Sequence, residues 1–325
     1  MSAAQRTEEG ARLVPHSALH TVDHRGAVNA TRFADERMAP GRFTLGFAVC
    51  AVMYGGPPHV GSPFHMMLQL ALNLIGGDET PPPTLNYFDA RGRGEAIRLA
   101  FADNGVTFKE NAFSSELWGK ERDDGLKAIW TAAGRLPFGQ VPLLTDGDYD
   151  TRGNWTSFEL VQSHAILRYI GRRGSWDGLR YTPGYYESPD RRVLAAIDMA
   201  ADGTEDVRKQ LSAIKYAEEP DAAKHKKYRA WFTGEANAPR WLGFFDTMLS
   251  KSSTSFVAGT PTPSHADYLL FDLLDYHEAC AAFEPALAAD LLSATKMPAL
   301  ASWREIMRRR PGIAAYLKSD GRRAA

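Results

Sequence analysis

The chain has 325 residues, of which 44% are hydrophobic and 24% are charged, and its formal net charge at pH 7 is −1. These values are ordinary for a folded protein of about two domains. They exclude a protein that is drawn to nucleic acid or to anionic membranes by its overall charge. The two cysteines, Cys50 and Cys280, are far apart and form no CxxC pair, and the histidines form no HExxH motif. We therefore expect a reducing compartment, no bound metal and no dithiol chemistry.

The first 80 residues carry few structural signals. Residues 1–42 are polar and lack a period, so we expect them to be poorly structured. The apolar run at residues 43–54 is too short to span a bilayer and lies too far from the start for a signal peptide. We interpret residues 1–80 as an extension, with an erroneous upstream start or a targeting role as open alternatives. We expect a cytoplasmic protein without stable membrane insertion.

A strand, a tight turn and a helix follow at residues 85–104. The strand is apolar and aromatic, and Arg91-Gly92-Arg93 breaks it. Residues 96–101 place apolar side chains on one helical face, and Asn104-Gly105 suits a helix end. This order aims Tyr87 at a helix N-terminus, where backbone N–H groups favour an anion. The alternative is a half-buried strand tyrosine followed by a solvated turn.

The stretch that follows suggests a small mixed sheet. Val141 must be extended because a proline follows it, and Pro142 marks a turn that a cis bond would suit. In chain order we expect a strand at 106–112, irregular chain and short helices at 114–135, a strand at 143–144, a turn at 146–148, a strand at 158–161 and a helix at 162–172. The order βαβ and then ββα predicts an α/β domain over residues 84–174.

No strand signal remains from residue 188 onward. Ser188-Pro189 reads as the N-cap and first residue of a helix that ends near Tyr216. Ser264 and Asp267 form a capping box before an apolar run, with Asp in place of the usual Glu. Further helices are expected at 238–249, 298–309 and 313–318. The sequence thus predicts an all-helical domain over residues 188–320.

Five motifs link these elements to a known family. They are Tyr87-Phe88 with Arg91-Gly-Arg93, Phe138-Gly-Gln-Val-Pro142, Leu160-Val-Gln-Ser163 with Ile166-Leu-Arg-Tyr169, Asp202-Gly-Thr-Glu-Asp206 with Arg208, and Ser264-x-x-Asp267-Tyr268 with Asp272-Leu-Leu. In this order they resemble the cytosolic glutathione S-transferases, nearest the pi, sigma and mu classes, over residues 84–318. The resemblance implies a thioredoxin-like α/β domain followed by an all-α domain, with glutathione as co-substrate and no metal.

The implied reaction needs a thiolate at neutral pH, whereas a cysteine thiol in a model peptide titrates at about 8.5. A hydroxyl that donates a hydrogen bond to the sulfur stabilises the charged form and lowers the thiol pKa. Tyr87 matches the tyrosine that does this in the resembling classes. Arg93 is expected nearby, where it would supply a positive field. These two residues are the implied catalytic pair.

The resemblance also implies the glutathione contacts. Gln162 and Ser163 match the pair that holds the γ-glutamyl end, although by themselves they suit a strand end and an N-cap. Val141, before Pro142, would pair its backbone with the cysteinyl part, and Gln140 would add a side-chain contact.

Trp118 matches the tryptophan beside the glycine carboxylate. Trp130 is a competing candidate, because the stretch from Trp118 to Phe138 is longer than usual. The lysine that normally follows is Lys120 or Lys127. The segment 148–157 reads as a second insertion, close to the expected site.

The family further implies a homodimer and a pocket for an electrophilic small molecule. Phe138 matches an aromatic that inserts into the partner subunit, and Asp206 matches an acidic residue that reaches the neighbour's glutathione, unless it is a solvated helix carboxylate. The pocket would include Phe88, Ala90 and Tyr216, the last of which is otherwise a helix-end aromatic. The sequence does not define the electrophile.

Three functions fit this pattern. The first is a transferase that conjugates glutathione to electrophiles in detoxification. The second is a glutathione-dependent isomerase of the prostaglandin D synthase kind, because sigma-class enzymes share these motifs. The third is a binding protein that kept the fold without the activity. Retention of Tyr87, Gln162 and Ser163 argues against the third.

Overall fold

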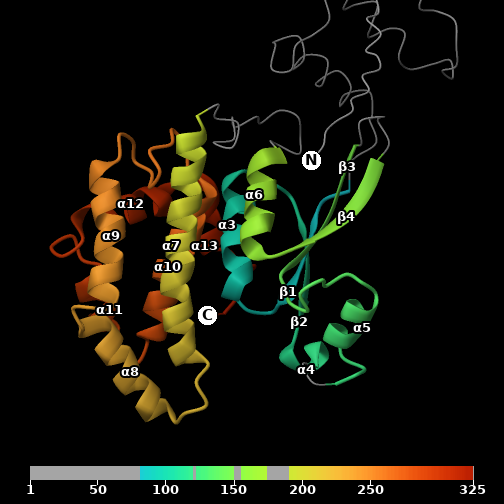
Figure 1. Ribbon diagram of the computed structural model, residues 1–325, viewed down its shortest axis with the longest axis horizontal. Coiled ribbons are helices and arrows are strands. Elements are labelled where there is room, and N and C mark those ends of the chain that lie inside the picture. The colour runs from blue at the N-terminus through green and yellow to red at the C-terminus, as the bar shows by residue number, and fades with distance from the viewer. Residues whose placement is uncertain (1–80, 120–121, 150–154, 174–189, 325) are drawn as a thin grey trace, which may run out of the picture. The chain divides into compact units, whose positions relative to one another are not determined.

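The computed structural model describes residues 81–119, 122–149, 155–173 and 190–324. An α/β part with a mixed sheet comes first, and an all-helical part follows it (Figure 1). The fold class expected from the sequence is therefore confirmed. The expectations for residues 1–80, for Lys120 and for the middle of the 148–157 segment lie outside the described residues. The proposed domain boundaries stay predictions.

The sheet has four strands in the order β2-β1-β3-β4. They are β1 (Thr84–Phe88), β2 (Lys109–Phe113), β3 (Leu143–Tyr149) and β4 (Trp155–Val161). β1 pairs in parallel with β2 over its whole length and antiparallel with β3 over residues 84–86, so it is an internal strand. A tyrosine at the end of such a strand is held firmly, because the strand cannot shift without breaking two ladders.

Two helices cover the side of the sheet that faces the helical part. They are α3 (Glu95–Asp103) and α6 (Ser163–Arg173), which lie side by side in Figure 1. A short 3-10 helix, η2 (Gly92–Gly94), joins β1 to α3. Two short helices, α4 (Ser115–Trp118) and α5 (Leu126–Ala132), follow β2, in the stretch where irregular chain and short helices were expected.

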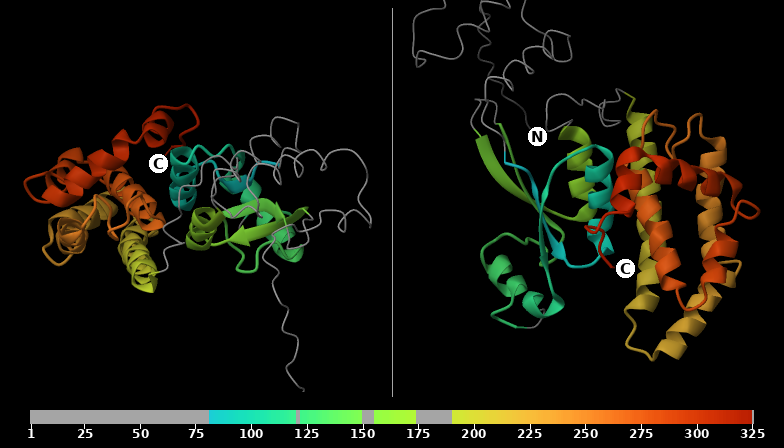
Figure 2. Two further views of the ribbon diagram at one scale, coloured as in Figure 1. Left: turned by 90° about the horizontal axis from the view of Figure 1, so that it is seen from above. Right: turned by 180° about the vertical axis from the view of Figure 1, so that it is seen from behind.

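The helical part is built around one buried helix, α10 (His265–Cys280). It packs against α7 (Arg191–Lys215) and against α3, and both neighbours bury apolar side chains toward it. The remaining helices are α8 (Asp221–Thr233), α9 (Ala238–Lys251), α11 (Pro285–Leu291), α12 (Pro298–Arg309) and α13 (Pro311–Leu317). Figure 2 shows α13, in red, beside α3, in teal, so the end of the chain returns to the α/β part.

The prediction of a turn at residues 146–148 is wrong. β3 continues through Gly147 to Tyr149, and Gly147 pairs with Ser157 of β4. Asp146 is buried and accepts hydrogen bonds from the Gly147 N–H at 2.8 Å and from the Tyr169 hydroxyl at 3.0 Å. The Asp-Gly signal is local, and pairing with a strand ten residues further on outweighs it.

The start of the first long helix also differs from expectation. Its N-cap is Asp190, whose carboxylate accepts a hydrogen bond from the Arg192 N–H at 2.9 Å, and not Ser188. The sequence signals missed α8 and α11 altogether. In α8 the buried side chains Tyr228, Trp231 and Phe232 gather in the second half, so the helix shows no continuous apolar stripe.

The capping box at the start of α10 is confirmed. The Asp267 carboxylate is fully buried and accepts four hydrogen bonds. Two come from the Ser264 N–H and hydroxyl, both at 2.8 Å, one from the Val257 N–H at 3.1 Å and one from the Trp303 indole at 2.9 Å. This carboxylate therefore ties α10 to α12 as well as capping its helix.

We expect Asp267→Ala to lower the free energy of unfolding by about 3 kcal/mol or more, because four buried donors lose their acceptor. Asp290→Ala, which removes an exposed carboxylate paired with Lys296, is the matched control and should change stability far less. Denaturant unfolding of both variants measures the difference. Equal, small losses in both would show that the capping box contributes little.

Candidate active site

The end of β1 presents Tyr87 at the bottom of a cavity. The tyrosine is 7% exposed, and its hydroxyl oxygen accepts a hydrogen bond from the backbone N–H of Arg93 at 2.8 Å. Burial raises the pKa of the Tyr87 hydroxyl, although the Arg93 N–H and the positive charges of Arg93 and Arg208 oppose the rise. The hydroxyl therefore stays protonated at neutral pH and keeps its hydrogen available for donation.

Two glycines make room for the Tyr87 ring. Gly92 has φ of +41°, and a Cβ atom on it would lie 2.5 Å from the Tyr87 hydroxyl oxygen. A Cβ atom on Gly94 would lie 2.8 Å from a ring carbon of the same tyrosine. Both contacts are too close for any side chain, so the turn can approach the phenol only because it lacks side chains there.

The Arg93 side chain points away from Tyr87 and joins α7. Its guanidinium donates two parallel hydrogen bonds of 2.8 Å to the Glu205 carboxylate. Burial alone would raise the pKa of Glu205, but the hydrogen bonds and charge of Arg93 hold it below its ordinary value. Arg93 thus serves the site in two ways: its N–H fixes Tyr87, and its side chain fixes the turn to the helical part.

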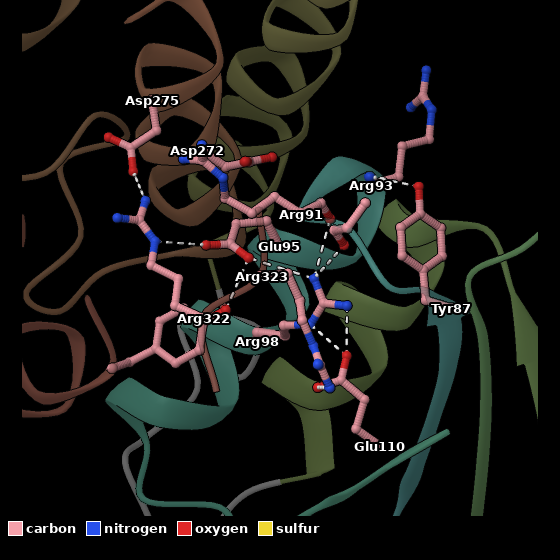
Figure 3. A network of polar contacts seen from close by, with 12 residues as sticks. Tyr87, Arg91, Arg93, Glu95, Arg98, Glu110, Asp272, Asp275, Arg322 and Arg323 are labelled. Carbon is pink, nitrogen blue, oxygen red and sulfur yellow. Dashed lines mark hydrogen bonds and ion pairs between the residues drawn. The ribbon is translucent and has the colours of Figure 1, made fainter. Parts of the chain in front are cut away.

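A network of buried charges holds this turn from the other side (Figure 3). Glu95 and Arg98 are fully buried and form an ion pair with each other at 3.5 Å. Arg98 also pairs with Glu110 of β2 at 2.5 Å. Glu95 accepts hydrogen bonds from the Tyr316 hydroxyl at 2.9 Å and from the Arg322 guanidinium at 3.3 Å. Two residues near the chain's end, Tyr316 and Arg322, therefore donate hydrogen bonds to Glu95, which directly follows the turn.

The segment after α13 touches the turn itself. The Arg91 N–H donates to the carbonyl oxygen of Ala324 at 2.9 Å. Arg323 pairs with Asp89 at 2.9 Å and with Glu110 at 3.4 Å. Asp89 stands between Tyr87 and Arg91, so the ends of the turn are bound to a segment more than 200 residues away.

A cavity of about 210 Å³ opens over Tyr87. One wall comes from β1 and the following turn, and it comprises Tyr87, Phe88, Arg91, Gly92 and Arg93, with Gln140 and Val141 beside them. The opposite wall comes from α7 and α10, and it comprises Arg208, Ser212, Lys215, Tyr216, Asp272, Tyr276 and Ala279. The cavity thus lies where the α/β part meets the helical part, and it needs both.

The wall from α7 and α10 combines cations with aromatic rings. The Arg208 guanidinium pairs with the Asp272 carboxylate and lies 5.1 Å from the centre of the Tyr276 ring. The Lys215 ammonium lies 5.0 Å from the same ring centre and 5.9 Å from that of Tyr216. Burial raises the pKa of Asp272 to about 7, against the opposing charge of Arg208.

The structure places six of the expected site residues in the cavity lining. They are Tyr87, Phe88, Arg93, Gln140, Val141 and Tyr216. Ala90 is not in that lining, and its carbonyl accepts a hydrogen bond from Arg98 at 3.0 Å. Asp206 is exposed on α7, outside the lining. Their expected roles stay predictions.

Trp118 lies among aromatic side chains. It is 6% exposed, stacks on Phe113 with ring centres 5.7 Å apart, and meets Phe88 edge to face. The competing Trp130 packs against Trp118 at 6.5 Å. Neither lines the cavity over Tyr87, so the contact with a glycine carboxylate stays a prediction for either residue.

The Gln162-Ser163 pair stands at the first turn of α6. Gln162 has φ of 74°, and it is the one non-glycine residue with positive φ in the described part of the chain. Such a backbone costs roughly 1–3 kcal/mol and tends to persist at binding sites. Ser163 is buried at the helix N-terminus, and the Val141-Pro142 peptide bond is cis, as expected.

Sequence reasoning assigned no role to Glu205, Ser212, Lys215 or Tyr276. Helical spacing could have grouped Ser212 and Lys215 with Arg208, because positions 208, 212 and 215 fall on one face. No local signal links Arg93 to Glu205, which lies 112 residues further on. No group of His, Cys, Asp and Glu that could hold a metal ion exists among the described residues, and none of the described helices could cross a membrane.

Comparisons with known proteins agree with this arrangement. Two family models match: Glutathione S-transferase, N-terminal domain, over residues 83–172, and Glutathione S-transferase, C-terminal domain, over residues 205–320. The chain is 33% identical to glutathione S-transferase P 1 of Xenopus laevis, over 74% of this chain and 94% of that protein. It is also 33% identical to glutathione S-transferase P of Homo sapiens, over 74% and 93%.

A solved structure supports the fold. The Pi-class glutathione S-transferase of Onchocerca volvulus matches with a TM-score of 0.54 at 23% identity. The match covers 73% of this chain and 92% of that chain.

We expect Arg322→Met to lower the free energy of unfolding by about 1–3 kcal/mol, because the buried carboxylates of Glu95 and Asp275 each lose a cationic partner. Arg309→Met is the matched control, because Arg309 is exposed and pairs with the half-exposed Glu305 on its own helix. Thermal or denaturant unfolding measures both. If the two substitutions act alike, the contact between Arg322 and Glu95 does not support the turn.

Proposed function

Because the chain belongs to the glutathione S-transferase family, we propose that it conjugates reduced glutathione to electrophilic small molecules through a thiolate that Tyr87 stabilises. The observation that carries this proposal is the state of the Tyr87 hydroxyl. Its oxygen already accepts a hydrogen bond from the Arg93 N–H at 2.8 Å, and the Tyr87 side chain lines a cavity. A phenol arranged in this way donates to whatever anion lies in front of it.

The energetics suit a thiolate. Burial raises the pKa of Tyr87, so the phenol does not ionise in place of the thiol. When the thiol of glutathione loses its proton, the sulfur gains a charged hydrogen bond, which is about twice as strong as a neutral one. Arg93 and Arg208 add positive charge around the same point. The thiol pKa should therefore fall in the site.

The glutathione contacts follow the cavity rim and the first turn of α6. Gln140 and Val141 line the cavity next to Tyr87, and the backbone of Val141, before the cis bond to Pro142, would pair with the cysteinyl part of the tripeptide. The strained backbone of Gln162 turns the chain into α6, and Ser163 begins that helix. A helix N-terminus attracts a carboxylate, which suits the γ-glutamyl end.

The second substrate would lie against the wall from α7 and α10. Phe88 and Tyr216 face this space from opposite sides. Positioning two reactants together and stabilising the thiolate would supply most of the rate enhancement.

A homodimer is the proposed assembly. Phe138 is 67% exposed, which is unusual for so large an apolar side chain in a loop and suits insertion into a partner subunit. Asp206 is exposed on α7 and free to reach the α-amino group of a glutathione bound by the partner. A cytoplasmic location remains a prediction.

We expect Tyr87→Phe to raise the pKa of the bound thiol and to lower turnover near pH 7 about ten-fold or more, because roughly 1.4 kcal/mol of lost stabilisation suffices. The rising limb of the pH–rate profile should move to higher pH. Thiolate absorbance of the enzyme–glutathione complex, titrated against pH, measures the shift. Tyr268→Phe is the control, since that hydroxyl contacts Asp103, away from the cavity. An unchanged thiol pKa would remove Tyr87 from the mechanism.

We expect Phe138→Ser to weaken the dimer and to lower activity in parallel, because an apolar anchor is lost.

Asp206→Ala should weaken glutathione binding while the dimer stays intact. Sedimentation velocity and calorimetric binding separate the two effects. Full activity of the unmodified chain as a monomer at micromolar concentration would contradict the shared-site arrangement.

A further inference from the structure

We propose that this cavity prefers electrophiles that carry a carboxylate or another anionic group, and that Lys215 binds that group. The inference rests on the proposed function, because it concerns the second substrate of the same site. It is carried by the distribution of charge around the cavity.

Four cations and one carboxylate line the cavity. The cations are Arg91, Arg93, Arg208 and Lys215, and the carboxylate is Asp272. Most of these charges already have partners within the protein. Arg93 is bound to Glu205 by two hydrogen bonds, and Arg208 is paired with Asp272.

Arg91 is also directed toward this pair. Its backbone is fixed by the carbonyl of Ala324, and its guanidinium lies beside Asp272 (Figure 3). Asp272 thus faces two guanidinium groups.

Lys215 stands apart from these pairs. No carboxylate in the described part of the chain forms an ion pair with it, and its ammonium is held instead between the rings of Tyr276 and Tyr216, at 5.0 and 5.9 Å from their centres. Ring faces attract a cation without neutralising it. The wall from α7 and α10 therefore presents, at Lys215, a positive charge that no carboxylate of the described residues pairs with.

The position of Lys215 suits the second substrate. It lies two helical turns beyond Arg208 on α7, about 10 Å along the helix axis. Tyr216, the next residue, is near enough to Tyr87 for a charge on one to affect the pKa of the other. A small molecule can therefore bring its reactive carbon to the sulfur near Tyr87 while its far end meets Lys215.

The two carboxylates of glutathione have other predicted partners. One is expected at Ser163 and the other beside Trp118, and neither residue lines this cavity. The groups around Lys215 are instead hydrogen-bonding hydroxyls, those of Ser212 and Tyr276, whose oxygens lie 3.5 Å apart. An ammonium with two hydroxyls nearby is a fitting receptor for a carboxylate.

Two conjugates of glutathione test this inference by binding alone. One carries a 4-carboxybenzyl group on the sulfur, and the other carries the methyl ester of that group. Calorimetry gives the dissociation constant of each for the unmodified protein and for Lys215→Met. We expect Lys215→Met to weaken binding of the carboxylate about ten-fold and to change binding of the ester less than two-fold.

Two further variants complete the design. Lys215→Arg keeps the charge and should retain the preference for the carboxylate. Lys251→Met, at the exposed C-terminal end of α9, removes a lysine outside the cavity and should change neither constant. Equal weakening of both conjugates by Lys215→Met, or no weakening of either, would overturn the role of Lys215 while leaving the proposed transferase intact. If neither conjugate binds the unmodified protein, the glutathione site itself is wrong.

Discussion

The hydrogen bond from the Arg93 N–H to the Tyr87 oxygen requires a turn that most side chains would block. Gly92 and Gly94 supply the space, but glycines also make a turn easy to deform. The surrounding protein therefore has to hold the turn in place. It does so with charge: Arg93 binds Glu205 on one side, and Glu95 binds Arg98 and Arg322 on the other. The position of the tyrosine hydroxyl thus depends on ion pairs made outside the cavity.

These ion pairs also join the two parts of the fold. Glu95 begins α3 of the α/β part, whereas Tyr316 and Arg322 belong to the helical end of the chain. A buried carboxylate that lost these partners would carry a desolvation penalty of several kcal/mol. The helical part is therefore more than a wall for the second substrate. It supplies the hydrogen bonds and the positive charge that offset the desolvation penalty of Glu95, and so it stabilises the conformation of the catalytic turn in the α/β part.

The sequence predicted well those features that are encoded by neighbouring residues. The strand that carries Tyr87 and the capping box at Ser264 each follow from a few adjacent side chains. The prediction at Asp146-Gly147 was wrong because β4 pairs with that segment, and no local signal reports a partner strand. The contacts of Arg93 with Glu205 and of Glu95 with Arg322 span 112 and 227 residues. Such contacts become visible only when the chain is folded.

One face of α7 shows how long-range pairing decides chemistry. In the sequence, Glu205, Arg208 and Lys215 are three charged residues of one helix. Their neighbours along the chain do not indicate which of them pairs within the protein and which can bind a ligand. In the fold, Glu205 pairs with Arg93 and Arg208 pairs with Asp272. Among the described residues, Lys215 lies near the rings of Tyr276 and Tyr216 at the cavity wall and forms no ion pair. Complementary charge between a site and its ligand contributes to specificity, so we expect Lys215, whose partner must come from the ligand, to contribute to the selectivity of the site toward a charged ligand.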